Sequence, residues 1–362
     1  MPKISEILKN KFPYSPTRDQ QDLFKLFDHF LSQDGPDTFL VKGYAGTGKT
    51  SIISSLVNIL PLFNYKYMLL APTGRAAKVL SSYSKRKAFT IHKIIYKLQL
   101  DKNTGELRFK RVKNYRKNTI FFIDESSMIY DDQQFGRSGL LKDLTSFVFE
   151  DPSNKIVFIG DTAQLPPVGQ EYSGALDKEN LELRYKLMVL EHELKDVVRQ
   201  EQDSGILSNA TDLREKISLD NLEIKFNSRS FRDVFKMKSD KLEDGLRYAY
   251  DKFGMEDSII ICKTNKQANM YNQFIRRNLL FFEDEIDAGD YIMIVKNNYY
   301  WLGEDSEAGF LANGDFAEVL KISNTEDRYG LRFADLTLRL IDYPDHHDIE
   351  AKVILNTLSA PN

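Results

Sequence analysis

The chain has 362 residues, of which 42% are hydrophobic and 28% are charged, and its formal net charge is −3. This is the composition of a globular protein, and no run approaches the roughly 20 apolar residues of a membrane-spanning helix. A single cysteine, Cys262, excludes an internal disulfide bond, so we expect a reducing, cytoplasmic location and no membrane partner.

Apolar runs in the first half of the chain predict the strands of a parallel α/β sheet. They are TFLVK (38–42), YKYMLLA (65–71), NTIFFID (118–124) and NKIVFIG (154–160). The stretches between them are long enough for crossover helices, and ligands of such sheets bind beyond the carboxyl ends of the strands. The segments that follow the runs are GYAGTGKT, PTGRAAK, ESS and DTAQLPPV. We therefore expect the chemically active residue types to gather at one edge of the sheet.

The first of these segments has the spacing of a phosphate-binding loop. Gly43 is followed by four residues and then by Gly48-Lys49-Thr50, which fits the pattern G-x-x-x-x-G-K-S/T. The backbone N–H groups of such a loop, with the positive end of the next helix, form a concave anion site. Lys49 would reach the β and γ phosphates, and the Thr50 hydroxyl would bind Mg²⁺. The sequence predicts ATP and Mg²⁺ as cofactors rather than a glycine turn with a solvated lysine. The residues assigned to the nucleotide are Gly43, Ala45, Gly46, Thr47, Gly48, Lys49 and Thr50.

Positive charge is concentrated in one part of the chain. Residues 71–117 contain 14 Lys and Arg against only Asp101 and Glu106, a net charge of +12, so the remainder carries −15. This asymmetry indicates a surface for a polyanion, with a solvated basic face as the simpler alternative. Within the segment, the runs on either side of Asn103-Thr104-Gly105 alternate as they do in a β-hairpin.

Further along, FFIDESS places Asp124 and Glu125 at the end of a strand, where adjacent side chains point in different directions. One carboxylate, which we assign to Asp124, can bind Mg²⁺ while its neighbour deprotonates the attacking water. The alternative is a helix N-cap. GDTAQLPPV then supplies Gln164, whose amide can donate to a γ-phosphate oxygen and accept from a water. The alternative here is a proline-rich surface turn.

The second half of the chain predicts a different organisation. A second α/β unit follows LSNATDLREKISL, with a strand at 258–264 and a helix at 265–280. From about Glu283, short alternating runs bounded by Asn, Gly and Asp predict a small antiparallel barrel. The predicted domains are residues 1–205 with a hairpin insertion at about 96–117, residues 206–282 as the start of a second domain, and residues 283–362 as the barrel.

The successive segments resemble the motifs of a known family. In order, GYAGTGKT, APTGRAAK, TIHK, IDESSM, GDTAQLPPVG and VVRQEQDSGIL resemble those of superfamily 1 helicases of the RecD-like, 5′-to-3′ branch, superfamily 1B. The resemblance runs from about Pro16 onward. It implies RecA-like P-loop NTPase domains with a hairpin pin and a β-barrel as insertions. It also implies a monomeric ATP-dependent DNA helicase that acts on single-stranded DNA and duplex junctions.

The resemblance further implies roles for individual residues. Gln20 matches the position that reads the adenine edge, and Arg199 matches an arginine that reaches the γ-phosphate. Taken alone, these would be a polar helix-terminal residue and a surface ion pair. His92 and Phe109 could equally belong to a core, although Phe109 lies where the family stacks a base. The residues assigned to nucleic acid are Pro72, Thr73, Thr90, His92, Phe109, Lys110 and Arg111.

The family's last motifs, of the HKAQG and VGVTR types, are not found in the sequence. We therefore expect the chain to be the N-terminal part of a helicase that lacks the later arginine of the ATP site. Rival hypotheses are an ATP-binding nucleic-acid clamp or switch without unwinding, and a nucleic-acid-binding module with a vestigial nucleotide site. A preference for DNA over RNA rests on the resemblance alone.

Overall fold

The computed structural model describes residues 3–32, 34–100, 107–129, 139–167, 169–196, 204–217, 223–295, 298, 302, 311, 314–343 and 346–358. Contacts between Cα atoms divide the chain into two units. The first comprises residues 1–199 with 295–298 and 309–314, and the second comprises the remainder. Each unit contains a sheet of its own.

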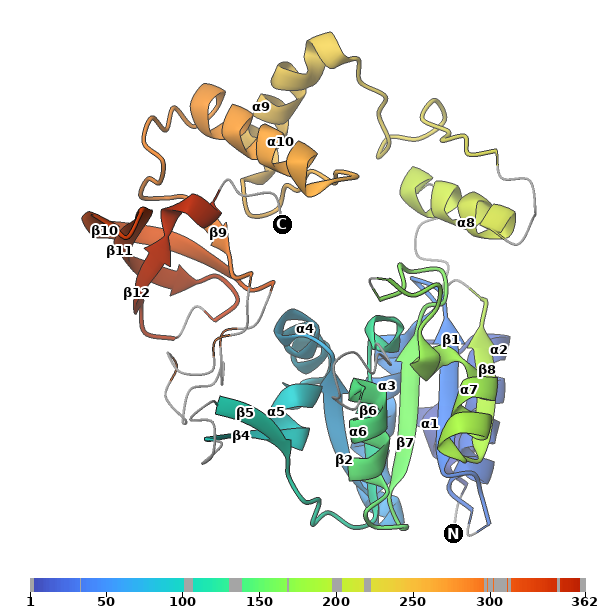
Figure 1. Cartoon of the computed structure of the whole chain (residues 1–362). Helices are drawn as coiled ribbons and strands as arrows, with labels where there is room; N and C mark the ends of the chain where they lie inside the picture. Colours follow the sequence, from blue (N-terminus) through green and yellow to red (C-terminus); the bar gives the residue numbers. More distant parts are fainter. Residues whose placement is uncertain are drawn as a thin grey trace. The chain divides into compact units, whose positions relative to one another are not determined.

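The first unit is a parallel sheet of six strands with helices on both faces (Figure 1). The strand order is β3–β2–β6–β7–β1–β8. The strands are β1 (Thr38–Gly43), β2 (Lys66–Ala71), β3 (Ala88–Thr90), β6 (Thr119–Ile123), β7 (Lys155–Gly160) and β8 (Val189–Leu194). β1, β2, β6 and β7 are the strands predicted from the apolar runs, and the α/β fold class is confirmed. Every residue of β6 is buried, as expected for a strand covered on both faces.

Successive side chains of the strands enter two separate cores. Phe39 and Phe122 pack with the helices of one face, whereas Leu40 and Phe121 pack with those of the other, because neighbouring residues of a strand point in opposite directions. The first face carries α1 (Ile4–Lys11), α2 (Arg18–Phe30), α3 (Lys49–Ile59), η1 (Leu60–Phe63) and α4 (Gly74–Ser84). The second carries α5 (Ile91–Ile95), α6 (Leu140–Val148), η4 (Gly174–Leu176) and α7 (Lys178–Tyr185).

The predicted hairpin is confirmed as the antiparallel pair β4 (Tyr96–Leu100) and β5 (Leu107–Arg111). Leu100 pairs with Leu107 at the outer end and Tyr96 with Arg111 at the base. The turn predicted at Asn103-Thr104-Gly105 lies outside the described residues. The hairpin therefore leaves the sheet after α5 and returns to it at β6.

The second unit combines helices with an antiparallel sheet of four strands. Its helices are α8 (Gly205–Ile217), η5 (Ser239–Lys241), α9 (Leu242–Phe253) and α10 (Asn265–Asn278). Its sheet has the order β12–β11–β10–β9, formed by β9 (Tyr291–Met293), β10 (Phe316–Arg328), β11 (Leu331–Leu340) and β12 (Ile349–Ile354), followed by η6 (Leu355–Thr357). The predicted antiparallel element and the predicted helix at 265–280 are confirmed. The pairings described for the sheet leave β12 and β9 as its edges.

The strand predicted at 258–264 is wrong. This segment has no strand partner among the described residues, and its Ile259 and Ile261 side chains are 81% and 90% exposed. The division predicted at residues 205 and 282 stays a prediction. In the described part of the chain, no helix is long and apolar enough to cross a membrane.

Candidate functional site

The loop after β1 has the backbone geometry that its glycines permit. Gly48 precedes α3 with φ 84° and ψ 21°, a left-handed conformation that favours glycine. A Cβ on Gly43 would lie 2.9 Å from Thr47 Oγ1 and 3.0 Å from Leu194 Cβ, so only glycine fits without a shift of its neighbours. The spacing found in the sequence therefore reflects a tight turn that delivers the chain into the first turn of α3.

Lys49 is held against this loop by the loop's own carbonyl groups. Its Nζ donates to Gly43 O at 2.7 Å and to Tyr44 O at 2.9 Å, and Thr47 Oγ1 donates to Tyr44 O at 2.8 Å. The ammonium group is thus already at the mouth of the loop backbone, where an incoming anion would compete with the carbonyl oxygens for it. A lysine in this place supplies a mobile point charge.

Gln20 ties the start of α2 to the same loop. Its Oε1 accepts from the Thr17 N–H at 3.1 Å while Thr17 caps the helix in return, and its Nε2 donates to Thr47 O at 2.9 Å. The residue is 1% exposed. Both ends of the amide carry a protein partner, so Gln20 positions the loop in this structure. Its contact with adenine stays a prediction.

Asp124 and Glu125 follow β6, as predicted, and form the turn into η2 (Ser126–Met128). Burial and the neighbouring Glu125 carboxylate raise the pKa of Asp124 to about 6, while the Lys49 ammonium and the Glu125 N–H act to lower it. That N–H donates to Asp124 Oδ1 at 3.0 Å. Glu125 has φ 51°, a left-handed conformation that is costly for a residue with a side chain. The sheet therefore brings Asp124 within electrostatic reach of Lys49 and turns the chain sharply at Glu125.

Gln164 lies on the loop after β7, the strand between β6 and β1. Asp161 Oδ1 accepts from the Ala163 N–H at 2.9 Å, and the Gln164 N–H donates to Asp161 O at 3.2 Å. The Gln164 side chain then reaches the acidic turn, where its Oε1 accepts from Ser127 Oγ at 3.0 Å. Three predicted segments thus meet at the carboxyl ends of three adjacent strands. Sequence reasoning assigned no role to Ser127, and its place beside two carboxylates in DESS was the available signal.

The oxygen donors present fit a magnesium ion held jointly with a phosphate. Magnesium in such sites keeps several waters and takes one or two protein oxygens, and the Thr50 hydroxyl and the Asp124 carboxylate are the predicted candidates for that role. In the described part of the chain, no group of three or more His, Cys, Asp or Glu side chains could hold a metal by itself. Asp124 is a half-buried carboxylate whose charged form is disfavoured, which is the electrostatic condition that a cation relieves.

A groove runs along α3 beside the loop. It has a volume of about 440 Å³ and is bordered by Thr50, Ser51 and Ser54 of α3 and by Tyr14 from the segment that precedes α2. The Tyr14 side chain is 54% exposed. The groove therefore combines hydroxyl groups with an accessible aromatic ring next to the first turn of α3.

The residues assigned to nucleic acid at 72–92 follow β2 and β3, the two strands that lie beyond β6 in the sheet. Thr73 caps α4 by accepting from the Ala76 N–H at 3.2 Å, and Thr90 caps α5 by accepting from the Lys93 N–H at 3.2 Å. Thr90 pairs in register with Ala71, so β2 and β3 bring Pro72, Thr73 and Thr90 to neighbouring strand ends. The His92 ring lies 5.6 Å from the ring of Tyr96, and burial lowers the pKa of His92.

The hairpin residues differ in their surroundings. Lys110 is exposed, whereas Arg111 Nη1 pairs with Glu150 Oε1 at 2.5 Å, and Glu150 Oε2 accepts from the Asn114 N–H at 2.6 Å. On the opposite strand, Tyr96 Oη donates to Asp143 Oδ2 of α6 at 2.7 Å. The base of the hairpin is therefore fixed to α6 and to the segment that follows it. The backbone of Phe109 pairs with Leu98, but the Phe109 side chain and all of Arg199 lie outside the described residues.

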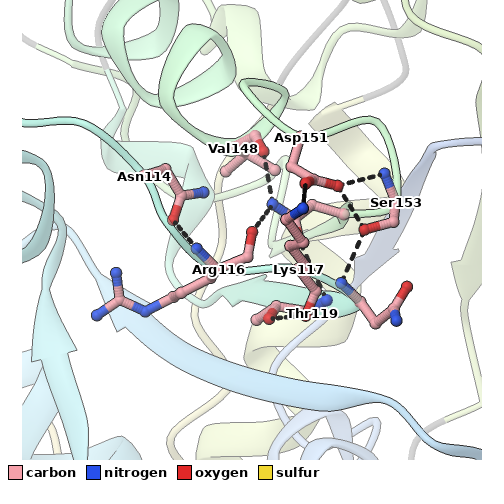
Figure 2. Close-up of polar contacts among 9 residues, drawn as sticks. Asn114, Arg116, Lys117, Thr119, Val148, Asp151 and Ser153 are labelled. Atoms are coloured by element: carbon pink, nitrogen blue, oxygen red, sulfur yellow. Dashed lines mark hydrogen bonds and ion pairs between the residues drawn. The ribbon is translucent and has the colours of Figure 1, made fainter.

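The segment that returns from the hairpin to β6 is fixed by side chains rather than by regular structure (Figure 2). Asn154 Nδ2 donates to Arg116 O and to Val148 O, both at 2.9 Å, and its Oδ1 accepts from the Thr119 N–H at 3.0 Å. Asp151 pairs with Lys117 at 3.7 Å. Figure 2 shows the Arg116 guanidinium extending away from these contacts. The segment therefore has a fixed path, and the Arg116 guanidinium takes no part in the contacts that fix it.

Comparison with known proteins places the chain in a family. Residues 19–225, more than half of the chain, match a family model described as an AAA domain. The chain belongs to the AAA domain family. It is 24% identical to the ATP-dependent DNA helicase dda of Enterobacteria phage T4, over 87% of this chain and 72% of that protein. It is 28% identical to the ATP-dependent RecD2 DNA helicase of Deinococcus radiodurans, over 36% of this chain and 16% of that protein. These relatives confirm the resemblance indicated by the motifs.

Other relatives are longer than the region they share with this chain. An uncharacterized protein of Acanthamoeba polyphaga mimivirus is 28% identical over 85% of this chain, which spans 64% of that protein's length. Among solved structures, a Pif1 helicase from Bacteroides in complex with ADP-AlF3 and ssDNA has a TM-score of 0.47 and 16% identity. That similarity covers 92% of this chain and 74% of the Bacteroides chain.

Proposed function

We propose that the chain is an ATP-dependent DNA helicase or translocase of the RecD-like type, which couples hydrolysis of Mg·ATP to 5′-to-3′ movement on single-stranded DNA. The observation that carries the proposal is the meeting of three segments at adjacent strand ends: the phosphate loop after β1, the Asp124–Glu125 turn after β6 and Gln164 after β7. Each segment supplies a different part of phosphoryl transfer to water.

In this site, the loop N–H groups and Lys49 would hold the β and γ phosphates, and Thr50 and Asp124 would hold Mg²⁺. A bound Mg²⁺ would supply charge neutralisation on the phosphate oxygens. Glu125, placed beyond Asp124 by its left-handed backbone, takes the proton of the attacking water. We assign the adenosine end of the nucleotide to the groove along α3, where the exposed Tyr14 ring can stack on a base. Arg199 is proposed to contact the γ-phosphate.

The nucleic-acid strand is proposed to lie over β2 and β3, beside the nucleotide at β6, β7 and β1. Thr73, Thr90 and a His92 ring kept neutral by its lowered pKa offer hydrogen bonds to a sugar-phosphate backbone without reading sequence. Phe109 and Lys110 on β5 extend this surface along the hairpin. Because β2 is the direct neighbour of β6, the nucleic acid and the nucleotide phosphates would then lie at the same edge of one sheet.

The experiment that tests the proposal compares the parent chain with Lys49→Ala. We expect calorimetry to show Mg·ATP binding by the parent and a loss of about 2–4 kcal/mol in the variant, tens- to several-hundredfold in affinity. Lys178→Ala, which removes a lysine of α7 paired with Glu182, is the control and should bind as the parent does. Equal affinity of the Lys49 variant and the parent would remove the loop from the site.

Polarity is tested separately, with duplexes that carry a single-stranded tail at the 5′ or the 3′ end. A helicase of this branch separates only the 5′-tailed substrate. Binding of nucleotide and strand with no DNA-stimulated hydrolysis would instead identify a clamp or switch.

A further inference from the structure

Ser127 joins the acidic turn to Gln164. It lies in η2, two residues after Glu125, and is 3% exposed. Its Oγ donates to Gln164 Oε1 at 3.0 Å. The bond links the turn that carries both carboxylates with the loop that carries the amide, and the chain separates the two residues by 37 positions.

The Ser127 end of this bond is held by buried hydroxyl groups. Ser126 Oγ donates to Ile123 O at 2.8 Å and accepts from the Ile159 N–H at 3.3 Å. Ser173 Oγ donates to Ser126 O at 2.8 Å. A Cβ on Gly160 would come within 3.1 Å of Ser127 N, so the end of β7 lies directly against the turn. The Ser127 hydroxyl therefore has little freedom of position.

At the Gln164 end of the bond the backbone is fixed, but the side-chain amide can take either of two orientations. Asp161, 1% exposed, closes the loop through its contacts with Ala163 and Gln164. A glutamine amide has one accepting end and one donating end, and rotation by half a turn exchanges them. A phosphate oxygen only accepts hydrogen bonds. Whichever end Ser127 engages thus decides what Gln164 can offer to a nucleotide.

We propose that Ser127 is a positioning residue that orients the Gln164 amide so that its NH₂ group donates to the γ-phosphate. The inference rests on the proposed ATP site and deepens it. Ser127 engages the carbonyl oxygen and leaves the amide nitrogen as the end directed to the nucleotide. Gln164 then acts as a donor that distinguishes ATP from ADP, and the water is left to Glu125.

The test uses the full chain and four variants: Ser127→Ala, Ser127→Thr, Gln164→Ala and Gln164→Glu. Affinities for Mg·ATPγS and Mg·ADP are measured by calorimetry. We expect Ser127→Ala to weaken ATPγS binding about fivefold, the effect of one hydrogen bond, with ADP binding unchanged. Ser127→Thr, which keeps the hydroxyl, should restore the parent value. Gln164→Glu, which replaces the donor by an acceptor on an exposed side chain, should lose at least as much ATPγS affinity as Gln164→Ala.

The double variant Ser127→Ala/Gln164→Ala decides whether Ser127 acts through the amide. It should bind ATPγS no more weakly than Gln164→Ala alone. Additive losses, or equal losses for ATPγS and ADP, would overturn the proposal and leave Ser127 a structural residue. Tight ATPγS binding by Gln164→Glu would show that the amide presents its carbonyl end instead.

A spectroscopic readout separates this inference from the proposed function. In the nucleotide-free chain labelled with [¹⁵N]glutamine, the Gln164 side-chain NH₂ signals are identified by their absence in Gln164→Ala. Ser127→Ala should shift these signals, and Ser127→Thr should return them. Absence of nucleotide binding by the parent chain would refute the proposed function, whereas unchanged NH₂ signals in Ser127→Ala would refute the positioning role alone.

Discussion

Asp124 has an unusual pKa for a carboxyl group. The protein partly buries its carboxylate and sets Glu125 beside it, and both effects raise the pKa of Asp124 to about 6. Lys49 opposes them only in part, and its ammonium is also bonded to Gly43 O and Tyr44 O. A charged Asp124 is therefore unfavourable in the protein alone and favourable beside a cation.

This arrangement predicts that the ionised Asp124 carboxylate lowers the stability of the fold while serving the proposed Mg²⁺ site. The folded pKa lies above the unfolded value of 3.8, so the free energy of unfolding should fall as pH rises from about 4 through about 6. Asp124→Asn keeps the acceptor for the Glu125 N–H and removes the ionisation. With EDTA present, it should be more stable than the parent by up to about 3 kcal/mol at pH 7.5. It should also lose Mg²⁺-dependent hydrolysis.

Urea unfolding at several pH values between 4 and 7.5 measures this difference. The advantage of Asp124→Asn should shrink to below about 1 kcal/mol at pH 4, where the folded carboxyl is protonated and the unfolded one, with its pKa of 3.8, is partly protonated. Asp22→Asn is the matched control, because a hydrogen bond from Lys25 lowers the pKa of Asp22 and gives the opposite trend with pH. A stability difference for Asp124→Asn that is independent of pH would contradict the account.

The residue types of the site were predictable because each belongs to a short contiguous motif that follows a strand. Lys49, Asp124, Glu125 and Gln164 could be named from the sequence for this reason. Their partners could not. The Ser127–Gln164 bond depends on which two strand ends become neighbours, and the bonds of Gln20 to Thr17 and Thr47 depend on where α2 meets the loop. These are properties of packing between distant segments.

At the scale of elements, two adjacent basic residues of the hairpin, Lys110 and Arg111, have different surroundings. Arg111 is paired with Glu150, which also accepts from the Asn114 N–H, whereas Lys110 is exposed. We assigned both to nucleic acid from the sequence. The structure gives Arg111 a protein partner at the base of the hairpin, so any contact it makes with a phosphate would compete with Glu150.

The two residues should therefore separate stability from binding. Arg111→Ala removes an ion pair with a partly buried carboxylate and should destabilise the chain by about 1 kcal/mol. Lys110→Ala should leave stability within about 0.5 kcal/mol of the parent and weaken binding of a single-stranded oligonucleotide. Thermal unfolding and fluorescence anisotropy measure the two effects. The reverse pattern, with Lys110 affecting stability and Arg111 affecting binding alone, would show that the assignment is inverted.

Two segments, one wrongly predicted to be a strand and one strand that was not predicted, show why elements are harder to predict than motifs. The segment 258–264 is apolar and β-branched, but a strand exists only where a partner pairs with it, and Ile259 and Ile261 are exposed instead. β8 carries Glu191, His192 and Glu193 and gave no strand signal. It pairs in parallel with β1, and a Glu191–Lys42 ion pair at 2.5 Å satisfies its charge. Strand pairing between distant segments therefore decided both cases, against the preference of the local sequence.

At the scale of the whole molecule, charge is separated rather than balanced. The net charge of −3 hides +12 on residues 71–117. Several of these cations have acidic partners in the first unit, such as Arg111 with Glu150 and Lys117 with Asp151. Lys110 and Lys113 are exposed, Lys113 lies 5.6 Å from the Tyr115 ring, and the half-buried Arg116 extends its guanidinium away from the contacts drawn in Figure 2.

Replacing Lys110, Lys113 and Arg116 together by alanine should make binding of single-stranded DNA less sensitive to salt. Each neutralised phosphate contributes about −0.7 to the slope of log affinity against log salt, so the slope should become shallower by about 2. The control triple of Lys178, Lys216 and Lys225 carries the same charge change, and each of these lysines pairs with a nearby glutamate or aspartate. A parent slope unchanged by the first triple would show that the basic segment is only a solvated face.

Because the hairpin is held at its base, its outer part can be exchanged without disturbing the sheet. Tyr96 and Arg111 face each other across its base, and each is bound to an acidic residue, Asp143 within α6 and Glu150 two residues after α6 ends. Everything beyond that pair can be lengthened, shortened or replaced while the joints and the sheet stay as they are. Variation during evolution, or grafting by an engineer, can therefore change how far this arm reaches and what it touches without altering the proposed nucleotide site.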